Sequence, residues 1–222
     1  MAICLPVLLF SSGLRLSFNE VRLYEYGFDK HQVTLLQPTD RARLSEIARE
    51  IISYWNSAEK LPGAALRRVF STPEETEHLQ EVKALVRRAY RAQGVSLGVV
   101  LAALAAGYAA MMRRGGAFRR WLVNWLVVGS GITVSLIMIL AVLAFTAFDW
   151  LWWQLHLVAF PGSTLWILDP GIHNMIRMFP GGFWFDATVF VTGGVAAAAL
   201  LIGGSGVAYL RSTKGVLRNE PG

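Results

Sequence analysis

Long apolar runs alternate with polar stretches along the chain. Three of these runs, at 95–112, 121–148 and 187–210, are long and apolar enough for transmembrane helices, which need roughly 20 residues. A shorter run at 1–18 is interrupted by Arg15, whose long side chain can reach back to water and extend the span. A cleaved signal peptide is the alternative for this run, but no small-residue cleavage site follows it. We therefore predict four transmembrane helices, the first at 1–18.

The polar segment 19–93 separates the first two predicted spans and is long enough for a small cap domain. It holds 11 of the 15 acidic residues. Two runs, VRLYEYGF and QVTLLQ, are β-prone and flank residues 29–31, which predicts a hairpin. An amphipathic helix is predicted from about Asp40 to Trp55, because apolar residues recur there at helical spacing. These residues are Leu44, Ile47, Ala48, Ile51 and Trp55.

A second cap helix has a start signal at Thr72. Thr72 suits the N-cap, Pro73 the first helical position, and Glu75 the third, where it closes a capping box. Further along this helix His78 shares one face with apolar residues, namely Val82, Leu85 and Ala89. His78 is therefore predicted to point inward, toward the cap core or the membrane. A hydrogen-bonded core histidine is the structural alternative to a functional one.

Basic residues mark the predicted cytoplasmic side. The loop after the second span holds Arg113, Arg114, Arg119 and Arg120, and the last span is followed by Arg211, Lys214 and Arg218. By the positive-inside rule both chain ends are cytoplasmic, whereas the cap and the segment 149–186 lie outside. The same rule accounts for much of the net charge of +6. No nucleic-acid-binding motif is present, so we expect no nucleic-acid partner.

These features predict an all-α membrane protein of four transmembrane helices with a small α(+β) extracytoplasmic cap between the first and second. The hydrophobic content of 54% and mean hydropathy of +0.43 agree with a membrane protein. The predicted division is a first helix at 1–18, a cap at 19–93, and a three-helix region at 94–222 with an interfacial loop at 149–186 and a cytoplasmic tail at 211–222. Close packing, rather than a hinge, is expected of the glycines in the last span, Gly193, Gly194, Gly203, Gly204 and Gly206.

The segment 149–186 is the strongest candidate for chemistry. It holds five of the eight tryptophans, and tryptophan favours the membrane–water interface. Ionisable residues at this depth are a functional hypothesis by default; here they are Asp149, His156, Asp169 and His173. If the third span continues past Phe148, Asp149 and His156 share a helix face, so the carboxylate can support the imidazole.

Asp169 and Pro170 predict a helix start, with the helix running to about Phe179, before Pro180 and two glycines break it. Asp169 therefore has a structural role as a helix cap beside any functional one. Arg177 in this helix is a candidate partner for a lipid phosphate, or reaches toward water by snorkelling.

Two histidines without a metal-binding pattern suit proton transfer near neutral pH. Zinc is disfavoured because HExxH is absent and the histidines are dispersed. No G-x-S-x-G elbow, P-loop or dinucleotide motif is present, and we expect no cofactor. Cys4 is the only cysteine, which excludes an intrachain disulfide and suits a small buried side chain.

Two stretches resemble the lipoprotein intramolecular transacylase family of small bacterial integral membrane proteins. The first is 72–83, in which His78 precedes an acidic-Val-Lys triplet that begins at Glu81. The second contains His156, Phe160, Trp166, Leu168-Asp169-Pro170, Ile176, Phe179-Pro180 and the run from Phe183 to Asp186. The similarity extends over nearly the whole chain. The chain departs from the family pattern at Glu81, where Asp is common, and at His173-Asn174, where the family often has Asp.

The resemblance implies four transmembrane helices and an extracellular cap, in the bacterial cytoplasmic membrane. It also implies transfer of the sn-2 acyl chain of a lipoprotein's diacylglyceryl-cysteine to its own α-amino group, which leaves a lyso-form lipoprotein. Lipid-anchored lipoproteins and membrane lipid are the expected partners. The essential histidines of the family correspond to His78 and His156.

For the chemistry we expect His156 to act as the base, with Asp149 behind it, and the other histidine to protonate the departing glycerol oxygen. Tyr24, Trp166 or Arg177 are candidates to hold the oxyanion, and Glu81 and Asp169 are further supporting candidates. A non-catalytic membrane scaffold is the alternative function. A transporter is disfavoured because the middles of the spans hold almost no ionisable residues. Acyl-chain preference and oligomeric state are not predicted.

Overall fold

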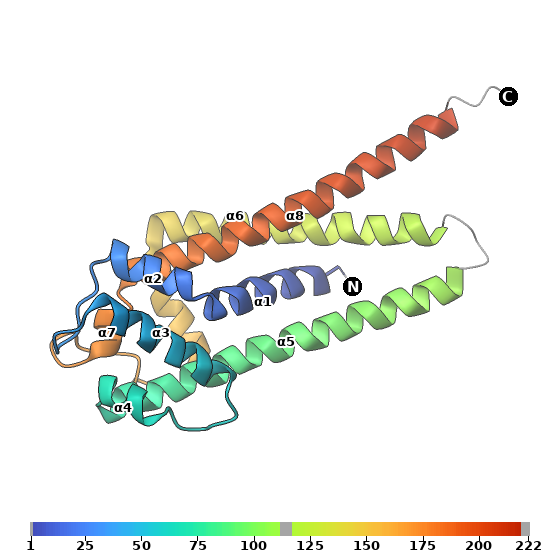
Figure 1. The fold of residues 1–222 in the computed structure, drawn as a ribbon. Helices are drawn as coiled ribbons and strands as arrows, with labels where there is room; N and C mark the ends of the chain where they lie inside the picture. Colours follow the sequence, from blue (N-terminus) through green and yellow to red (C-terminus); the bar gives the residue numbers. More distant parts are fainter. Residues whose placement is uncertain (1, 112–116, 219–222) are drawn as a thin grey trace. The chain divides into compact units, whose positions relative to one another are not determined.

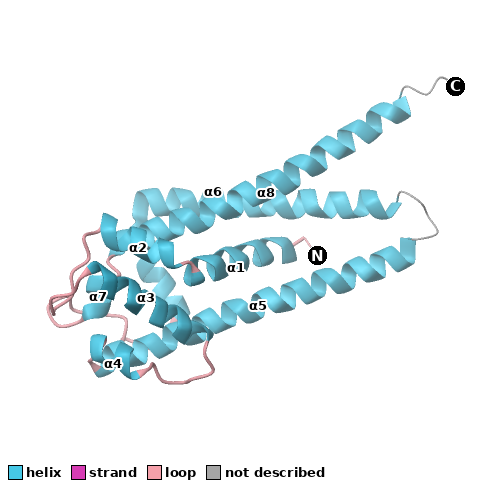
Figure 2. Ribbon diagram, viewed as in Figure 1, coloured by secondary structure: helices cyan, strands magenta, loops and turns pink. Residues whose placement is uncertain are grey.

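The structure, a computed structural model, describes residues 2–111 and 117–218, and this part of the chain folds into helices joined by turns and loops (Figure 1). No strand occurs in these two ranges (Figure 2). The helices are α1 (Cys4–Asn19), α2 (Val21–Lys30), α3 (Arg41–Asn56), α4 (Ala64–Val69), α5 (Pro73–Met111), α6 (Ala117–Ala159), α7 (Asn174–Met178) and α8 (Gly181–Arg218). The all-α prediction is confirmed.

The predicted β-hairpin in the cap is wrong. The first β-prone run forms α2, and the second is a loop. Tyr24, Gly27 and Phe28 are buried whereas Tyr26 is exposed, so the burial pattern of this run has the helical period rather than the strand period, which would bury Tyr26 with Tyr24 and Phe28. Glu20 caps the helix by accepting a hydrogen bond from the Arg22 N–H at 3.2 Å.

The predicted amphipathic helix of the cap is confirmed as α3. Asp40 is its N-cap and accepts a hydrogen bond from the Arg43 N–H at 2.8 Å. Its buried residues include every apolar residue of the predicted stripe, Leu44, Ile47, Ala48, Ile51 and Trp55. Burial also raises the pKa of the neighbouring Tyr54 to about 12.

The capping box at Thr72 is confirmed, but the helix that it starts is far longer than predicted. The Glu75 N–H donates to Thr72 Oγ1, and the Thr72 N–H donates to Glu75 Oε2, both at 3.3 Å. The second cap helix and the second span are then one helix of 39 residues, α5. No proline interrupts the sequence after Pro73 to end it, and Gly94 and Gly98 are accommodated in the helix interior.

Three helices are long and apolar enough to cross a membrane within the described ranges: Pro73–Ala110, Ala117–Ala159 and Gly181–Thr213. These contain the third and fourth predicted spans and residues 95–110 of the second. α1 has only 16 residues and is not among them, so the predicted count of four spans is not reached. Arg113 and Arg114, two of the basic residues that predict the cytoplasmic side, lie outside the described residues, as do residues 219–222 of the predicted cytoplasmic tail.

α6 and α8 differ in extent from the predicted third and fourth spans. α6 continues past Phe148 to Ala159, and its backbone leaves helical geometry at Ala147 (φ −151°, ψ 47°), so the part that carries His156 begins after a kink. α8 starts at Gly181, where a break was predicted, because Pro180 ends the preceding turn and the Phe183 N–H bonds back to its carbonyl oxygen at 2.9 Å.

The chain divides into two compact units. The first consists of 1–13, 90–141 and 191–222, and its core contains Leu5, Val100 and Trp125. The prediction of close glycine packing is confirmed for Gly203 and Gly206, where an added Cβ would come within 2.8 Å of Ser130 and 2.6 Å of Val127. It is wrong for Gly193, Gly194 and Gly204, which have open space on the Cβ side.

The second unit consists of 14–89 and 142–190 and contains every candidate site residue. Its core is aromatic, with the rings of Tyr24, Phe28, Phe179 and Phe183 packed at centroid distances of 5.1–6.4 Å. Lys30 and His31, which follow each other at the end of α2, both bind Asp186, at 2.7 and 2.9 Å. The Asp186 hydrogen bond raises the pKa of Lys30.

Candidate active site

His78 lies on α5, in the second helical turn after the capping box. The prediction that it points inward is confirmed, because only 6% of its surface is exposed. Its Nδ1 lies 3.2 Å from Glu81 Oε2, one turn further along the same helix. A carboxylate only accepts hydrogen bonds, so Nδ1 carries the proton and donates it, and the neutral ring keeps its lone pair at Nε2. Glu81 thus fixes the tautomer of His78.

His156 lies on the part of α6 that follows the kink and is 8% exposed. Its Nδ1 is 2.8 Å from the carbonyl oxygen of Trp152, one turn earlier. Because a carbonyl oxygen only accepts, this ring also donates from Nδ1, and its lone pair is also at Nε2. The prediction that Asp149 supports His156 is wrong. The hydrogen-bond acceptor of His156 is the Trp152 carbonyl oxygen, and Asp149 is exposed.

The two histidines, 78 residues apart in the chain, lie side by side. Their ring centroids are 6.3 Å apart and their planes differ by 28°. Phe160 packs edge-on against His78 at 5.0 Å and contacts His156 at 5.6 Å. Trp152 and Trp166 contact the His156 ring at 4.6 and 4.9 Å. The structure therefore forms a buried histidine pair with aromatic walls.

Of the predicted supporting residues, Glu81 and Trp166 contact the pair. The Trp166 ring packs on His156, but its Nε1–H donates to the Ser163 carbonyl oxygen at 3.0 Å. That hydrogen bond holds the 163–166 turn and leaves Trp166 as a wall rather than an oxyanion donor in this conformation.

Other predicted site residues make structural contacts elsewhere in the second unit. The Tyr24 hydroxyl donates to the Phe18 carbonyl oxygen at 3.2 Å within the aromatic core. Arg177 donates to the carbonyl oxygens of Thr34 and Pro170, at 3.0 and 3.1 Å, and so joins two loops. Neither set of contacts brings a donor to the histidines.

Asp169 caps a turn instead of a helix. Its Oδ1 accepts from the Gly171 N–H at 2.7 Å, and His173 Nδ1 accepts from the Asp169 N–H at 2.9 Å. The helix predicted from Pro170 to about Phe179 is reduced to α7, which begins at Asn174. Asp169 therefore has a structural role, as the alternative to a functional role predicted, but its side chain closes a turn and does not cap a helix.

Sequence reasoning missed two buried polar residues close to the site. Glu75, 1% exposed, was assigned to the capping box alone, but its Oε1 also accepts from the Met175 N–H at 2.8 Å. Asn174, 8% exposed, donates to the Val69 carbonyl oxygen and accepts from the Leu36 N–H, both at 2.8 Å. Each contact joins residues more than 90 positions apart, so local sequence signals carry no sign of it.

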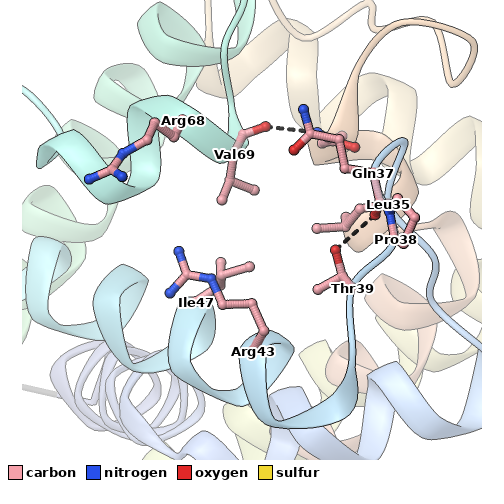
Figure 3. Close-up of a pocket in the computed structure, with 9 residues that line it drawn as sticks. Leu35, Gln37, Pro38, Thr39, Arg43, Ile47, Arg68 and Val69 are labelled. Atoms are coloured by element: carbon pink, nitrogen blue, oxygen red, sulfur yellow. Dashed lines mark hydrogen bonds between the residues drawn. The ribbon is translucent and has the colours of Figure 1, made fainter.

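A separate polar pocket lies in the second unit between the 35–39 loop, α3 and α4 (Figure 3). It encloses about 530 Å³ of empty space, including the part open to solvent. Arg43 and Arg68 reach it from opposite helices, and neither histidine lines it. Within the described ranges no group of three or more His, Cys, Asp or Glu side chains is arranged to hold a metal ion.

A buried histidine pair with oriented tautomers, in a chain with three helices long and apolar enough to cross a membrane, indicates a membrane protein whose site is suited to acid–base chemistry. The family model described as "Lipoprotein intramolecular transacylase Lit" matches residues 1–184. The chain belongs to this family and is a membrane enzyme, an intramolecular lipoprotein transacylase.

Solved structures agree with this assignment at the level of the fold. The chain is similar to the membrane-integral lipoprotein intramolecular transacylase Lit from Bacillus cereus, with a TM-score of 0.78 and 16% identity over 97% of this chain and 94% of that chain. Two variants of the Bacillus cereus protein, with a histidine replaced by arginine or by alanine, match with TM-scores of 0.71 and 0.70. Their identities are 13% and 15%, over 96% of this chain and 90% and 91% of theirs. No curated protein matches the chain.

Proposed function

We propose that this transacylase moves the sn-2 acyl chain of a diacylglyceryl-cysteine lipoprotein to the α-amino group of the same cysteine, with His78 and His156 as the catalytic residues. The observation that carries the proposal is the stacked, buried pair itself, 6.3 Å between ring centroids. Both Nδ1 atoms are held by hydrogen-bond acceptors, so Nε2 is the nitrogen of each ring that is left to exchange a proton with a substrate.

His78 acts as the base in this scheme, which reverses the role expected from the sequence. A carboxylate behind an imidazole stabilises the imidazolium that forms when the ring takes a proton. Glu81 supplies that carboxylate at His78, whereas His156 has only a carbonyl oxygen. The neutral His78 takes a proton from the substrate amine as the nitrogen attacks the ester carbonyl.

His78 then gives this proton to Nε2 of His156, directly or through water, and His156 passes it to the glycerol oxygen as the carbon–oxygen bond breaks. The amide bond forms and the ester bond is lost. One proton has moved from the amine to the glycerol oxygen, and both rings are neutral again. Ester and amine belong to one lipid-anchored residue, so little orientational entropy remains to be lost in the reaction.

The chain is placed in this proposal in the bacterial cytoplasmic membrane, with cap and histidines on the extracytoplasmic side, both termini inside, and α1 as a fourth crossing. The packing of Leu5 against Val100 and Trp125, which lie on two of the long apolar helices, supports a membrane position for α1. Its 16 residues are short for a span, and Arg15 extends it by reaching the interface.

The topology is tested by thiol labelling. In a Cys4→Ser chain, a cysteine introduced at Arg49 should react with a membrane-impermeant thiol reagent added outside intact cells. Protection of this cysteine from the reagent would contradict the proposed topology.

The catalytic roles are tested by mass spectrometry of a lipoprotein co-expressed with each variant. The parent chain should yield the N-acylated lyso form, whereas His78→Ala and His156→Ala should each leave the diacylglyceryl form with a free amine. Glu77→Ala is the matched control, because Glu77 is exposed and adjoins His78. Lyso-form product from either histidine variant at the parent level would refute the proposal and leave the histidines structural.

A further inference from the structure

Glu75 makes more contacts than helix capping requires. One carboxylate oxygen closes the capping box with Thr72, and the other accepts the Met175 N–H at 2.8 Å. Its side chain is among the most deeply buried of the second unit, with 1% of its surface exposed. Burying a carboxylate is costly unless its oxygens are hydrogen-bonded, and a capping box functions equally well at a solvent-exposed helix end.

The hydrogen bond from Glu75 to Met175 joins α5, which carries His78, to α7, which follows the connection from α6. On one side, Glu75 precedes His78 by three residues, a rise of about 4.5 Å along α5. On the other side, Met175 lies in α7, at the end of the connection that leaves α6 after His156. That same connection carries Phe160 and Trp166, which pack on the histidine rings.

Asn174 strengthens the same junction. Its amide N–H donates to the carbonyl oxygen of Val69, the last residue of α4, and its carbonyl oxygen accepts from the Leu36 N–H. Glu75 and Asn174 together form a buried polar junction in which both carboxylate oxygens and both ends of the amide are hydrogen-bonded. A fully satisfied buried network of this kind fixes one arrangement of the segments that it joins.

We infer that Glu75 is a positioning residue of the reaction, which sets the placement of His78 against His156 through its hydrogen bond to Met175. This inference rests on the proposed roles of the histidines. Proton transfer between groups on separate segments requires placement to within a fraction of an ångström, so release of one segment reduces the rate more than it reduces substrate binding.

Three substitutions separate positioning from simple capping. Glu75→Asp keeps the charge and can cap α5, but it is one methylene too short to bridge to Met175 as well. Glu75→Gln keeps the length, and its amide oxygen can accept the Met175 N–H. Thr72→Ala removes a capping group and leaves the bond to Met175 in place.

The measurement is kcat and KM for a purified diacylglyceryl lipoprotein in lipid nanodiscs, together with the Tm of each variant. Glu75→Asp should lower kcat on the order of 10- to 100-fold with KM nearly unchanged. Glu75→Gln should recover most of this loss. Thr72→Ala should lower Tm and leave kcat at the parent value. A His78→Ala arm is included to test the histidine roles themselves.

A kcat for Glu75→Asp within about twofold of the parent would overturn the inference, as would Thr72→Ala and Glu75→Asp losing kcat equally, since capping alone would then explain both. If Glu75→Asp fails to fold, Glu75→Gln decides, because it must retain kcat when the bond to Met175 is what matters. Activity in His78→Ala would instead refute the proposed function. An inactive His78→Ala beside a fully active Glu75→Asp would refute only the role of Glu75.

Discussion

The hydrogen bonds at the two Nδ1 atoms decide what each histidine can do. His78 is held by the Glu81 carboxylate and His156 by the Trp152 carbonyl oxygen. Both neutral rings therefore accept protons at Nε2, but only His78 has a negative charge behind it to stabilise the imidazolium. In the proposed scheme this difference gives the two histidines distinct roles, although both rings are buried among aromatic side chains.

Removal of the charge behind His78 should slow the reaction without abolishing it. Glu81→Gln keeps a hydrogen-bond acceptor for Nδ1–H but loses the carboxylate, so the rate constant for acyl transfer should fall roughly 10- to 100-fold. Asp149→Asn serves as the comparison, because Asp149 is exposed and does not hold the His156 ring. Single-turnover rates measured for both variants test the assignment; a larger loss in Asp149→Asn than in Glu81→Gln would return the base role to His156.

The sequence pattern predicted which site side chains are buried better than it predicted their hydrogen-bond partners. The helical spacing around His78 indicated an inward side chain, and the side chain is buried. The prediction that one helix carries both Asp149 and His156 is confirmed, because α6 continues past Phe148. The prediction that Asp149 supports the His156 ring is wrong, because Asp149 is exposed. Seven residues along a helix place two Cα atoms on one face but do not decide which acceptor the ring finds, and a carbonyl oxygen one turn away lies closer.

At the scale of the elements, the aromatic core of the second unit depends on the close approach of α2 and α8. Gly27 lies against the Phe183 ring, and Lys30 and His31 clamp Asp186 one turn later in α8. The aromatic core that includes Phe179 and Phe183 therefore depends on a helix surface without a side chain at position 27.

Gly27→Ala should destabilise the protein although alanine favours helices. The added Cβ would overlap the Phe183 ring, so the core must shift, at a cost of about 1–3 kcal/mol. Gly94→Ala is the matched control: Gly94 lies in the interior of α5 with open space on its Cβ side, so alanine there should be neutral or stabilising by up to about 1 kcal/mol. Thermal unfolding in detergent measures both variants. An equal Tm for the two variants would show that the α2–α8 contact accommodates a Cβ at position 27 and would contradict this prediction.

Helix boundaries were predictable where a local capping signal exists. The predictions were wrong where long-range packing determines the secondary structure. Asp40 and Thr72 start α3 and α5 as their capping residues predict. The β-prone run of α2 is helical because burial of Tyr24 and Phe28 outweighs strand propensity. The segment after Asp169 remains mostly turn, because the N–H groups of Gly171, Ile172 and His173 bond back to Asp169 and close local turns. The Met175 N–H in α7 bonds to the distant Glu75.

At the scale of the whole molecule, apolar run length and charge predicted a helical membrane protein, and these signals suffice because a bilayer demands internally satisfied backbone. The pairing of His78 with His156 could not be predicted from the periodicity of the sequence, because it depends on how α5 and α6 pack against each other. The predicted topology put both histidines on one side of the membrane, where they could converge, and the resemblance of two motifs to one family identified them as the essential pair. The Glu75 junction was not foreseen, since a capping box reads the same whether its glutamate is exposed or shared with another helix.

The central claim is that the two histidines act as one unit. Single-turnover acyl transfer in nanodiscs, compared for His78→Ala, His156→Ala and the double variant, tests it most directly. Groups that share one proton-transfer step are strongly non-additive, so each single variant should lose nearly as much rate as the double. Independent, multiplicative losses, or a single variant that keeps the parent rate while remaining folded, would contradict the account.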